Sequence, residues 1–170
     1  MTYFEERSRR VGMRVFGFLA RKPVFAMFGA LVVMLGLTGP SFAVLGGKAS
    51  SIAADQSQMK ASRRVTSNGR FQVHELQTDG NSVVREFVSP DGNVFGVTWT
   101  TQFVPQYSQL LGSYTARLNK AAQTRRNHRA PLNINEPGFV FSAFGHMRYY
   151  SGRAYIPSMV PAGVIAEEIR

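Results

Sequence analysis

Three histidines, His74, His128 and His146, are the side chains of this chain best suited to acid–base chemistry, because the sequence contains no cysteine. The Gly-x-Ser-x-Gly turn that presents a catalytic serine in many hydrolases is absent. A Ser/His/Asp site can assemble from residues far apart in the sequence, so a small hydrolase-like periplasmic enzyme stays open as the alternative function. The sequence itself nominates no catalytic residue.

The same histidines give no sign of a metal site. They are widely separated and none of them forms a His-x-x-x-His pair. His74 and Glu75 are neighbours in a predicted strand, where successive side chains point to opposite faces, so they do not chelate together. We therefore expect no metal site and no cofactor.

One short stretch near the C-terminal end combines basic and aromatic side chains that suit anion recognition. It contains His146, Arg148, Tyr150 and Arg153. In a strand, Arg148 and Tyr150 would share one side of the sheet. The simpler alternative is a half-buried sheet whose aromatic rings belong to the core. We keep these four residues as one candidate binding surface.

A second basic cluster, Arg125, Arg126 and Arg129, lies in a stretch with two prolines that predicts an exposed loop over residues 123–138. Arginines close to Phe139 are a pattern that nucleic-acid-binding proteins use for phosphates and bases. A solvated loop with no partner is the simpler interpretation. Because the chain carries an export signal, described below, we do not expect a nucleic-acid partner.

Three stretches of alternating apolar and polar residues predict strands over residues 71–76, 82–88 and 94–100. Thr78-Asp79-Gly80-Asn81 and Pro90-Asp91-Gly92-Asn93 separate them, and both tetrapeptides are typical of tight turns. Strands joined by tight turns pair with their sequence neighbours. The sequence therefore predicts an antiparallel three-strand meander.

Apolar residues at three- and four-residue steps predict one main amphipathic helix from Gln106 to Ala122. A shorter helix is predicted from Ser51 to about Ser62, where a hydroxyl residue precedes an acid in the first turn. Residues 139–144 and 147–156 predict a second, aromatic hairpin, and the tail from about residue 157 is expected to be irregular. The predicted fold is α+β, an antiparallel β-sheet with the main helix packed on one face.

The N-terminal segment has the order of a secretory signal peptide over residues 1–43. A basic stretch runs to Lys22, an uncharged apolar run covers residues 24–37, and Ser41-Phe42-Ala43 places small residues where a signal peptidase requires them. We predict cleavage after Ala43, which leaves a single mature α+β domain over residues 44–170. Met13 is an alternative start to Met1.

The alternative is an uncleaved inner-membrane anchor over residues 23–39. Those seventeen uncharged residues lie at the lower limit of the roughly 17–25 that a membrane-spanning helix needs. The short run and the small-x-small ending favour cleavage. Membrane contact is then expected only if the signal segment stays attached.

Charge is distributed unevenly along the chain. Residues 1–43 hold six Lys/Arg against two acids, whereas the other 127 residues hold 14 Lys/Arg against 8 acids, a net charge of +6. This basic balance favours contact with anionic surfaces without naming one. The absence of disulfides means that an exported domain must be stabilised by its core, which is feasible at this size.

Several segments, in order along the chain, resemble a family of small exported proteobacterial proteins, the domain of unknown function 2844 (DUF2844). They are Leu45-Gly46-Gly47, Ser51-Ile52, Ala54-Asp55-Gln56, Val84 to Gly92, Phe95 to Trp99, Gln109 to Tyr114, Gly145 to Arg148 and Gly152 to Pro157. The resemblance implies export and a shared fold. It implies no activity, cofactor or catalytic residue.

Two classes of function remain from the sequence. A binding module needs only an exposed basic or aromatic face, whereas an enzyme needs a pocket with converging polar groups. The sparse titratable residues favour a non-catalytic periplasmic or cell-envelope protein of a Gram-negative bacterium. We expect it to bind an anionic envelope component or to assist another exported protein.

Overall fold

The computed structural model describes residues 45–125, 127 and 130–170 of the chain. The predicted signal segment, its alternative as an anchor, and two arginines of the predicted basic loop, Arg126 and Arg129, lie outside these residues. Within the described residues, no helix is both long enough and apolar enough to cross a bilayer.

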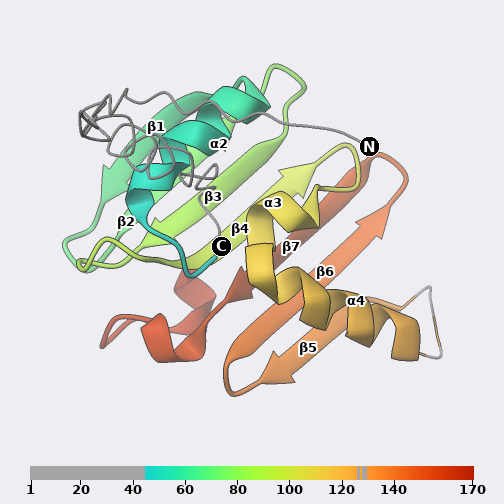
Figure 1. The fold of residues 1–170 in the computed structure, drawn as a ribbon. Helices are drawn as coiled ribbons and strands as arrows, with labels where there is room; N and C mark the ends of the chain where they lie inside the picture. Colours follow the sequence, from blue (N-terminus) through green and yellow to red (C-terminus); the bar gives the residue numbers. More distant parts are fainter. Residues whose placement is uncertain (1–44, 126, 128–129) are drawn as a thin grey trace, which may run out of the picture. The chain divides into compact units, whose positions relative to one another are not determined.

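One seven-stranded antiparallel sheet forms the centre of the fold (Figure 1), in the order β1-β2-β3-β4-β7-β6-β5. The predicted α+β class with an antiparallel sheet is confirmed. The strands are β1 (Ser62–Ser67), β2 (Gln72–Gln77), β3 (Val83–Val88), β4 (Val94–Thr101), β5 (Leu132–Glu136), β6 (Phe139–His146) and β7 (Tyr149–Tyr155). β4 pairs with β7, so the predicted meander and the aromatic hairpin join into a single sheet.

Neither edge strand, β1 or β5, is predicted from the sequence. Residues 123–138 were expected to be a loop, yet β5 occupies Leu132–Glu136 and pairs with β6. β1 begins at Ser62, where the predicted short helix was still expected to run. β1 is an edge strand with polar residues on both faces, so it lacks the apolar alternation that predicts strands. β5 does alternate, with Leu132 and Ile134 facing the core, but it is short and lies between Pro131 and Pro137, which predict a loop.

The helices lie on one face of this sheet (Figure 1). The short helix consists of the 3₁₀ turn η1 (Ala49–Ser51) and α2 (Ile52–Met59), and it ends where Lys60 adopts a left-handed conformation with φ of 49°. The main helical segment consists of α3 (Tyr107–Leu111), η2 (Gly112–Tyr114) and α4 (Thr115–Thr124). The predicted continuous helix is thus interrupted at Gly112, whose φ of 50° and ψ of −119° suit glycine.

The face of the sheet under the helices holds the larger core. Its buried residues come from the helices and from all strands except β1, and they include Ile52, Leu76, Trp99, Leu111 and Phe141. Trp99 packs edge-on against the ring of Tyr107 at 5.7 Å, which fixes α3 over β4. Helix packing on this face agrees with the prediction from apolar spacing.

The opposite face of the sheet is covered in part by the C-terminal tail. The tail has two 3₁₀ turns, η3 (Pro157–Met159) and η4 (Ala166–Glu168). Ile169, which follows η4, is fully buried in a cluster with Phe71, Phe87 and Phe95. Gly96 makes this approach possible, because a Cβ atom there would lie only 3.1 Å from Cγ2 of Ile169.

Candidate functional site

A row of alternating cationic and hydroxyl side chains crosses the sheet on the face that the tail partly covers. Arg85 on β3 pairs with Thr98 on β4, Thr98 pairs with Arg153 on β7, and Arg153 pairs with Ser142 on β6. Residues paired across antiparallel strands point to the same face. The antiparallel register therefore brings together four polar side chains that are distant in the sequence.

This row forms the floor of a cavity of about 370 Å³, which we call the arginine cavity. Such a volume lies at the lower end of the roughly 300–1,000 Å³ of small-molecule sites. The lining contains three arginines and no acidic side chain. The arginine cavity is lined by Arg85, Thr98, Trp99, Thr100, Ser142, Phe144, Tyr149, Ser151, Gly152, Arg153 and Arg170.

Two of the arginines are held in place by neighbouring groups. Nη1 of Arg153 donates a hydrogen bond of 2.8 Å to the backbone oxygen of Ala166 in the tail. Nε of Arg85 donates a hydrogen bond of 2.7 Å to Oε2 of Glu75 on β2. A guanidinium has five N–H donors, so each contact orients the side chain and leaves donors for a ligand.

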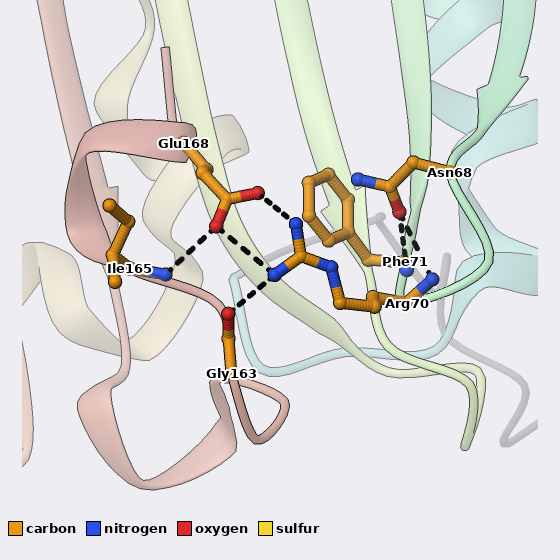
Figure 2. Close-up of polar contacts among 6 residues, drawn as sticks. All are labelled: Asn68, Arg70, Phe71, Gly163, Ile165 and Glu168. Atoms are coloured by element: carbon orange, nitrogen blue, oxygen red, sulfur yellow. Dashed lines mark hydrogen bonds and ion pairs between the residues drawn. The ribbon is translucent and has the colours of Figure 1, made fainter.

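The third arginine, Arg170, reaches the arginine cavity because the tail is fixed to the sheet. Arg70, in the β1–β2 turn, makes a 2.7 Å ion pair with Glu168 and also donates a hydrogen bond to the backbone oxygen of Gly163 (Figure 2). Glu168 in turn accepts a 3.2 Å hydrogen bond from the backbone nitrogen of Ile165. These contacts close the tail over the sheet just before Arg170.

The turn that carries Arg70 is itself ordered by Asn68. Oδ1 of Asn68 accepts hydrogen bonds from the backbone nitrogens of Arg70, at 3.1 Å, and Phe71, at 3.0 Å (Figure 2). This is an Asx-type turn, in which a short polar side chain replaces a backbone acceptor. It places Arg70 on the tail and Phe71 in the buried cluster around Ile169.

His146, Arg148, Tyr150 and Arg153, predicted to form one binding surface, lie in different places in the structure. Arg153 lies in the arginine cavity, whereas Tyr150 pairs with Thr101 and Gly145 on the helix-covered face. β7 begins at Tyr149, so Arg148 lies in the β6–β7 turn, where it is exposed and has a φ of 64°. His146 stacks on the ring of Tyr149 at 5.6 Å and is also exposed.

A second cavity of about 670 Å³ brings Arg125 close to two of these residues. His146, Tyr150 and Arg125 all line it, together with apolar side chains such as Val104. Arg125 donates a 3.2 Å hydrogen bond to the backbone oxygen of Ala130. The two predicted basic surfaces therefore meet at this cavity through Arg125, although the other loop arginines lie outside the described residues.

A buried polar cluster between α2 and the sheet is not among the features predicted from the sequence. Asp55 and Glu86 are each 1 % exposed and His74 is 4 % exposed. Nε2 of Gln109 donates a 3.0 Å hydrogen bond to Asp55, and Nη2 of Arg63 lies 2.6 Å from Nδ1 of His74. A signal was present in the sequence, because Glu86 lies between two valines on the apolar face of its strand.

Burial is the main reason that the pKa of Glu86 rises to about 8, and the negative charge of Asp55 raises it further. A hydrogen bond between the two carboxyl groups also favours the protonated acid. Perturbed acids of this kind are typical of catalytic sites. Neither carboxyl group lines the arginine cavity or the cavity at Arg125, however, so no space for a substrate adjoins them there.

In the part of the chain that the structure describes, no three His, Asp or Glu side chains gather in a way that would hold a metal ion. The description "Protein of unknown function (DUF2844)" belongs to the family model that matches residues 41–169. The chain belongs to the DUF2844 family. No curated protein and no solved structure matches it.

The match to the DUF2844 model covers the whole sheet and every residue of the arginine cavity except Arg170. Its description assigns no activity, so the function of this DUF2844 domain has to be argued from the geometry of its own residues. Two of the cavity arginines, Arg85 and Arg170, were not singled out from the sequence. They become neighbours of Arg153 only through strand register and the folding back of the tail.

Proposed function

We propose that this DUF2844 domain is a non-catalytic protein of the cell envelope, exported by its N-terminal segment, that binds an anionic group in the arginine cavity. One observation carries the proposal: three arginines line a single cavity whose lining contains no acidic side chain, and among the described residues Arg85 alone of the three is paired with a carboxylate, that of Glu75, outside the lining. Guanidinium groups are the preferred partners of phosphate and carboxylate, because their paired N–H donors match two oxygens at once.

The spacing of the arginines suits a single acidic group or two adjacent ones. Arg85 and Arg153 lie on strands separated only by β4, which corresponds to about 10 Å between their Cα atoms. Thr98 lies between them in the register. Long arginine side chains on either side of a hydroxyl can converge on one anion, and the hydroxyl supplies a further donor.

The rest of the lining suits a sugar attached to that anion. Phe144 and Tyr149 offer ring surface, with ring centroids 6.2 Å apart, and the hydroxyls of Thr100, Ser142 and Ser151 line the same cavity. Rings contact apolar faces while hydroxyls pair with polar groups. We therefore propose a phosphate- or carboxylate-bearing saccharide of the envelope as the ligand.

The enzyme alternative receives no comparable support. Its best acid–base pair, Asp55 and Glu86, is buried under α2 and does not line the arginine cavity. A catalytic acid has to come within hydrogen-bond reach of its substrate. The proposed function therefore assigns these acids no part in ligand binding.

Binding is tested by isothermal titration of the purified native protein with three probes: inorganic phosphate, a phosphorylated lipid A saccharide and a carboxylate-bearing peptidoglycan fragment. Because a hydrogen bond to a charged group contributes about 1.5–3 kcal/mol, Arg85→Ala and Arg153→Ala should each weaken binding by roughly tenfold to a hundredfold. Lys120→Ala is the matched control, because it removes one positive charge from an exposed α4 side chain that does not line the cavity.

The relative affinities of the saccharides distinguish phosphate from carboxylate as the recognised group. Equal binding by the wild type and both arginine variants would refute the proposed site.

Export is tested separately by intact mass and cell fractionation. We expect the mass of residues 44–170 in the periplasmic fraction, and a full-length protein in the inner membrane would refute cleavage after Ala43.

A further inference from the structure

Large exposed apolar side chains of this domain are concentrated at one end of the sheet. Among the described residues seven such side chains are exposed, and five of them come from the β4–α3 loop and the β6–β7 hairpin. We call these five the apolar end. The apolar end consists of Phe103 (76 % exposed), Val104 (63 %), Phe144 (50 %), Met147 (86 %) and Tyr149 (42 %).

The pairing of β4 with β7 brings these two segments together. Thr101, the last residue of β4, pairs with Tyr150, so the loop after β4 and the turn before β7 lie at the same end of the sheet (Figure 1). Val104 also lines the same cavity as Phe144 and Tyr150. The apolar end is therefore one surface built from two neighbouring turns.

The composition of the apolar end is unusual for solvent-exposed turns. Tight turns usually carry glycine, asparagine, aspartate or serine, whereas the β6–β7 turn consists of Met147 and Arg148 between His146 and Tyr149. The stacked rings of His146 and Tyr149 and the adjacent Phe144 support this turn from one side. Apolar side chains thus project from a supported turn into solvent.

Two arginines lie at or beside the apolar end. Arg148 is exposed in the turn between Met147 and Tyr149. Arg125 lines the same cavity as Val104 and Phe144. No acid occurs in the sequence between residues 137 and 166.

We propose that the apolar end inserts into the interface of an anionic lipid bilayer, with Arg148 at the level of the headgroup phosphates. Aromatic and aliphatic side chains beside arginines are the composition that peripheral proteins use at this interface. Positive charge complements anionic headgroups and strengthens such binding. Two protruding turns suit insertion better than a protein interface of ordinary size, which needs about 800 Å² of matched surface on each partner.

The proposal does not depend on the ligand of the arginine cavity. Phe144 and Tyr149 line both regions, so they are left unchanged in the test. Phe103 and Met147 belong to the apolar end and do not line the arginine cavity. Variants at these two positions therefore test membrane contact separately from anion binding.

The test is flotation of the native protein with vesicles of phosphatidylglycerol and phosphatidylcholine, compared with vesicles of phosphatidylcholine alone. All variants are purified in the same processed form, so any residual N-terminal segment contributes equally. Because burying one large apolar side chain favours transfer by about 1.5–3 kcal/mol, Phe103→Ser and Met147→Ser should each reduce partitioning by about tenfold or more. Val65→Ser and Ile165→Ser are matched controls, exposed by 50 % and 58 % away from the apolar end.

Arg148→Asn tests the contribution of the positive charge of Arg148 to vesicle binding. Asparagine tolerates the left-handed backbone at this position, so the variant removes the charge without straining the turn. We expect weaker partitioning to anionic vesicles and little change on neutral ones. In a second measurement, Phe103→Trp should show a blue shift of its indole fluorescence on addition of anionic vesicles.

Equal flotation of the wild type and the Phe103 and Met147 variants would overturn the proposal. So would an indole fluorescence of Phe103→Trp that anionic vesicles leave unchanged. A wild-type dimer in sedimentation that becomes monomeric in these variants would assign the apolar end to a second copy of the chain instead of a bilayer.

Discussion

Asp55 on α2 and Glu86 on β3 are hydrogen-bonded to one another although each side chain is only 1 % exposed. Two buried carboxylates cannot both be charged at low cost. Burial and the neighbouring Asp55 therefore raise the pKa of Glu86 to about 8, so Glu86 keeps its proton at neutral pH. Arg63 on β1 opposes this effect in part, and His74 on β2 lies opposite Glu86 in the register. This cluster joins α2 to three strands of the sheet.

The first prediction concerns the pH dependence of stability. Unfolded Glu86 releases its proton near pH 4.5, whereas the folded protein retains it up to about pH 8. The folded state therefore binds more protons in this window, and the free energy of unfolding should fall by a few kcal/mol as the pH rises through it. Glu86→Gln, which cannot deprotonate, should flatten this decline.

Denaturant unfolding of the wild type and the variant between pH 6.5 and 8 measures this effect. Glu136→Gln is the control, because it makes the same substitution at an exposed position outside the buried cluster. A wild-type free energy of unfolding that rises with pH over this range would contradict the prediction.

The second prediction is that His74 stays neutral under conditions that protonate a free histidine. Burial lowers its pKa below 6.5, and the positive charge of Arg63 lowers it further. The NMR titration midpoint of His74, assigned with His74→Gln, should therefore lie below 6.5. Because the pKa of His74 is lower in the folded than in the unfolded protein, the unfolded state binds the proton more readily. The free energy of unfolding should therefore decrease as the pH falls below 6.5.

The contribution of Arg63 to this pKa can be separated by substitution. Arg63→Gln should move the midpoint of His74 upward but keep it below 6.5, because burial is the larger cause. A midpoint at or above 6.5 in the wild type would show that water reaches the ring in solution.

The central strands could be predicted from the sequence because turn residues and alternation agree there. β2, β3 and β4 lie within about one residue of their predicted bounds. β1 could not be predicted, since its residues are mostly polar and only its pairing with β2 makes it a strand. β5 was missed because its short alternation lies between two prolines, beside the basic cluster. The break at Gly112 was also missed, because the apolar spacing continues across it.

The candidate site was predictable only in part for a related reason. Periodicity shows that two residues of one strand share a face, but it does not show which strands are neighbours. Arg153 was singled out from the sequence, whereas its partner Arg85 depends on the pairing of β4 with both β3 and β7. Arg170 depends on the ion pair that holds the tail, which no local pattern predicts.

The third prediction concerns the attachment of the tail. Ile169 is fully buried against Phe71, Phe87 and Phe95, whereas Ile165, four residues earlier, is 58 % exposed. Ile169→Ala should lower the free energy of unfolding by about 2–5 kcal/mol, because it leaves a cavity in this cluster. Ile165→Ala should change it by no more than about 0.5 kcal/mol.

Chemical denaturation measures both isoleucine variants. Ile169→Ala should also weaken ligand binding in the arginine cavity, because the tail carries Arg170 and accepts the hydrogen bond of Arg153 at Ala166. Equal stability losses in the two variants would show that the tail is not packed on the sheet in solution.

The last prediction concerns Gly152 on β7, over which the indole ring of Trp99 lies. A Cβ atom at this position would come within 2.4 Å of Cζ2 of Trp99 and 2.5 Å of the backbone oxygen of Ser142. The backbone oxygen belongs to a paired strand and cannot move away cheaply, so Gly152→Ala should destabilise the domain by about 1–3 kcal/mol. The near-ultraviolet circular dichroism of Trp99, the single tryptophan, should change as its ring is displaced. Gly80→Ala is the control, because the nearest atom to a Cβ there is 3.9 Å away. An unchanged Trp99 signal together with wild-type stability in Gly152→Ala would mean that the indole ring does not lie over β7.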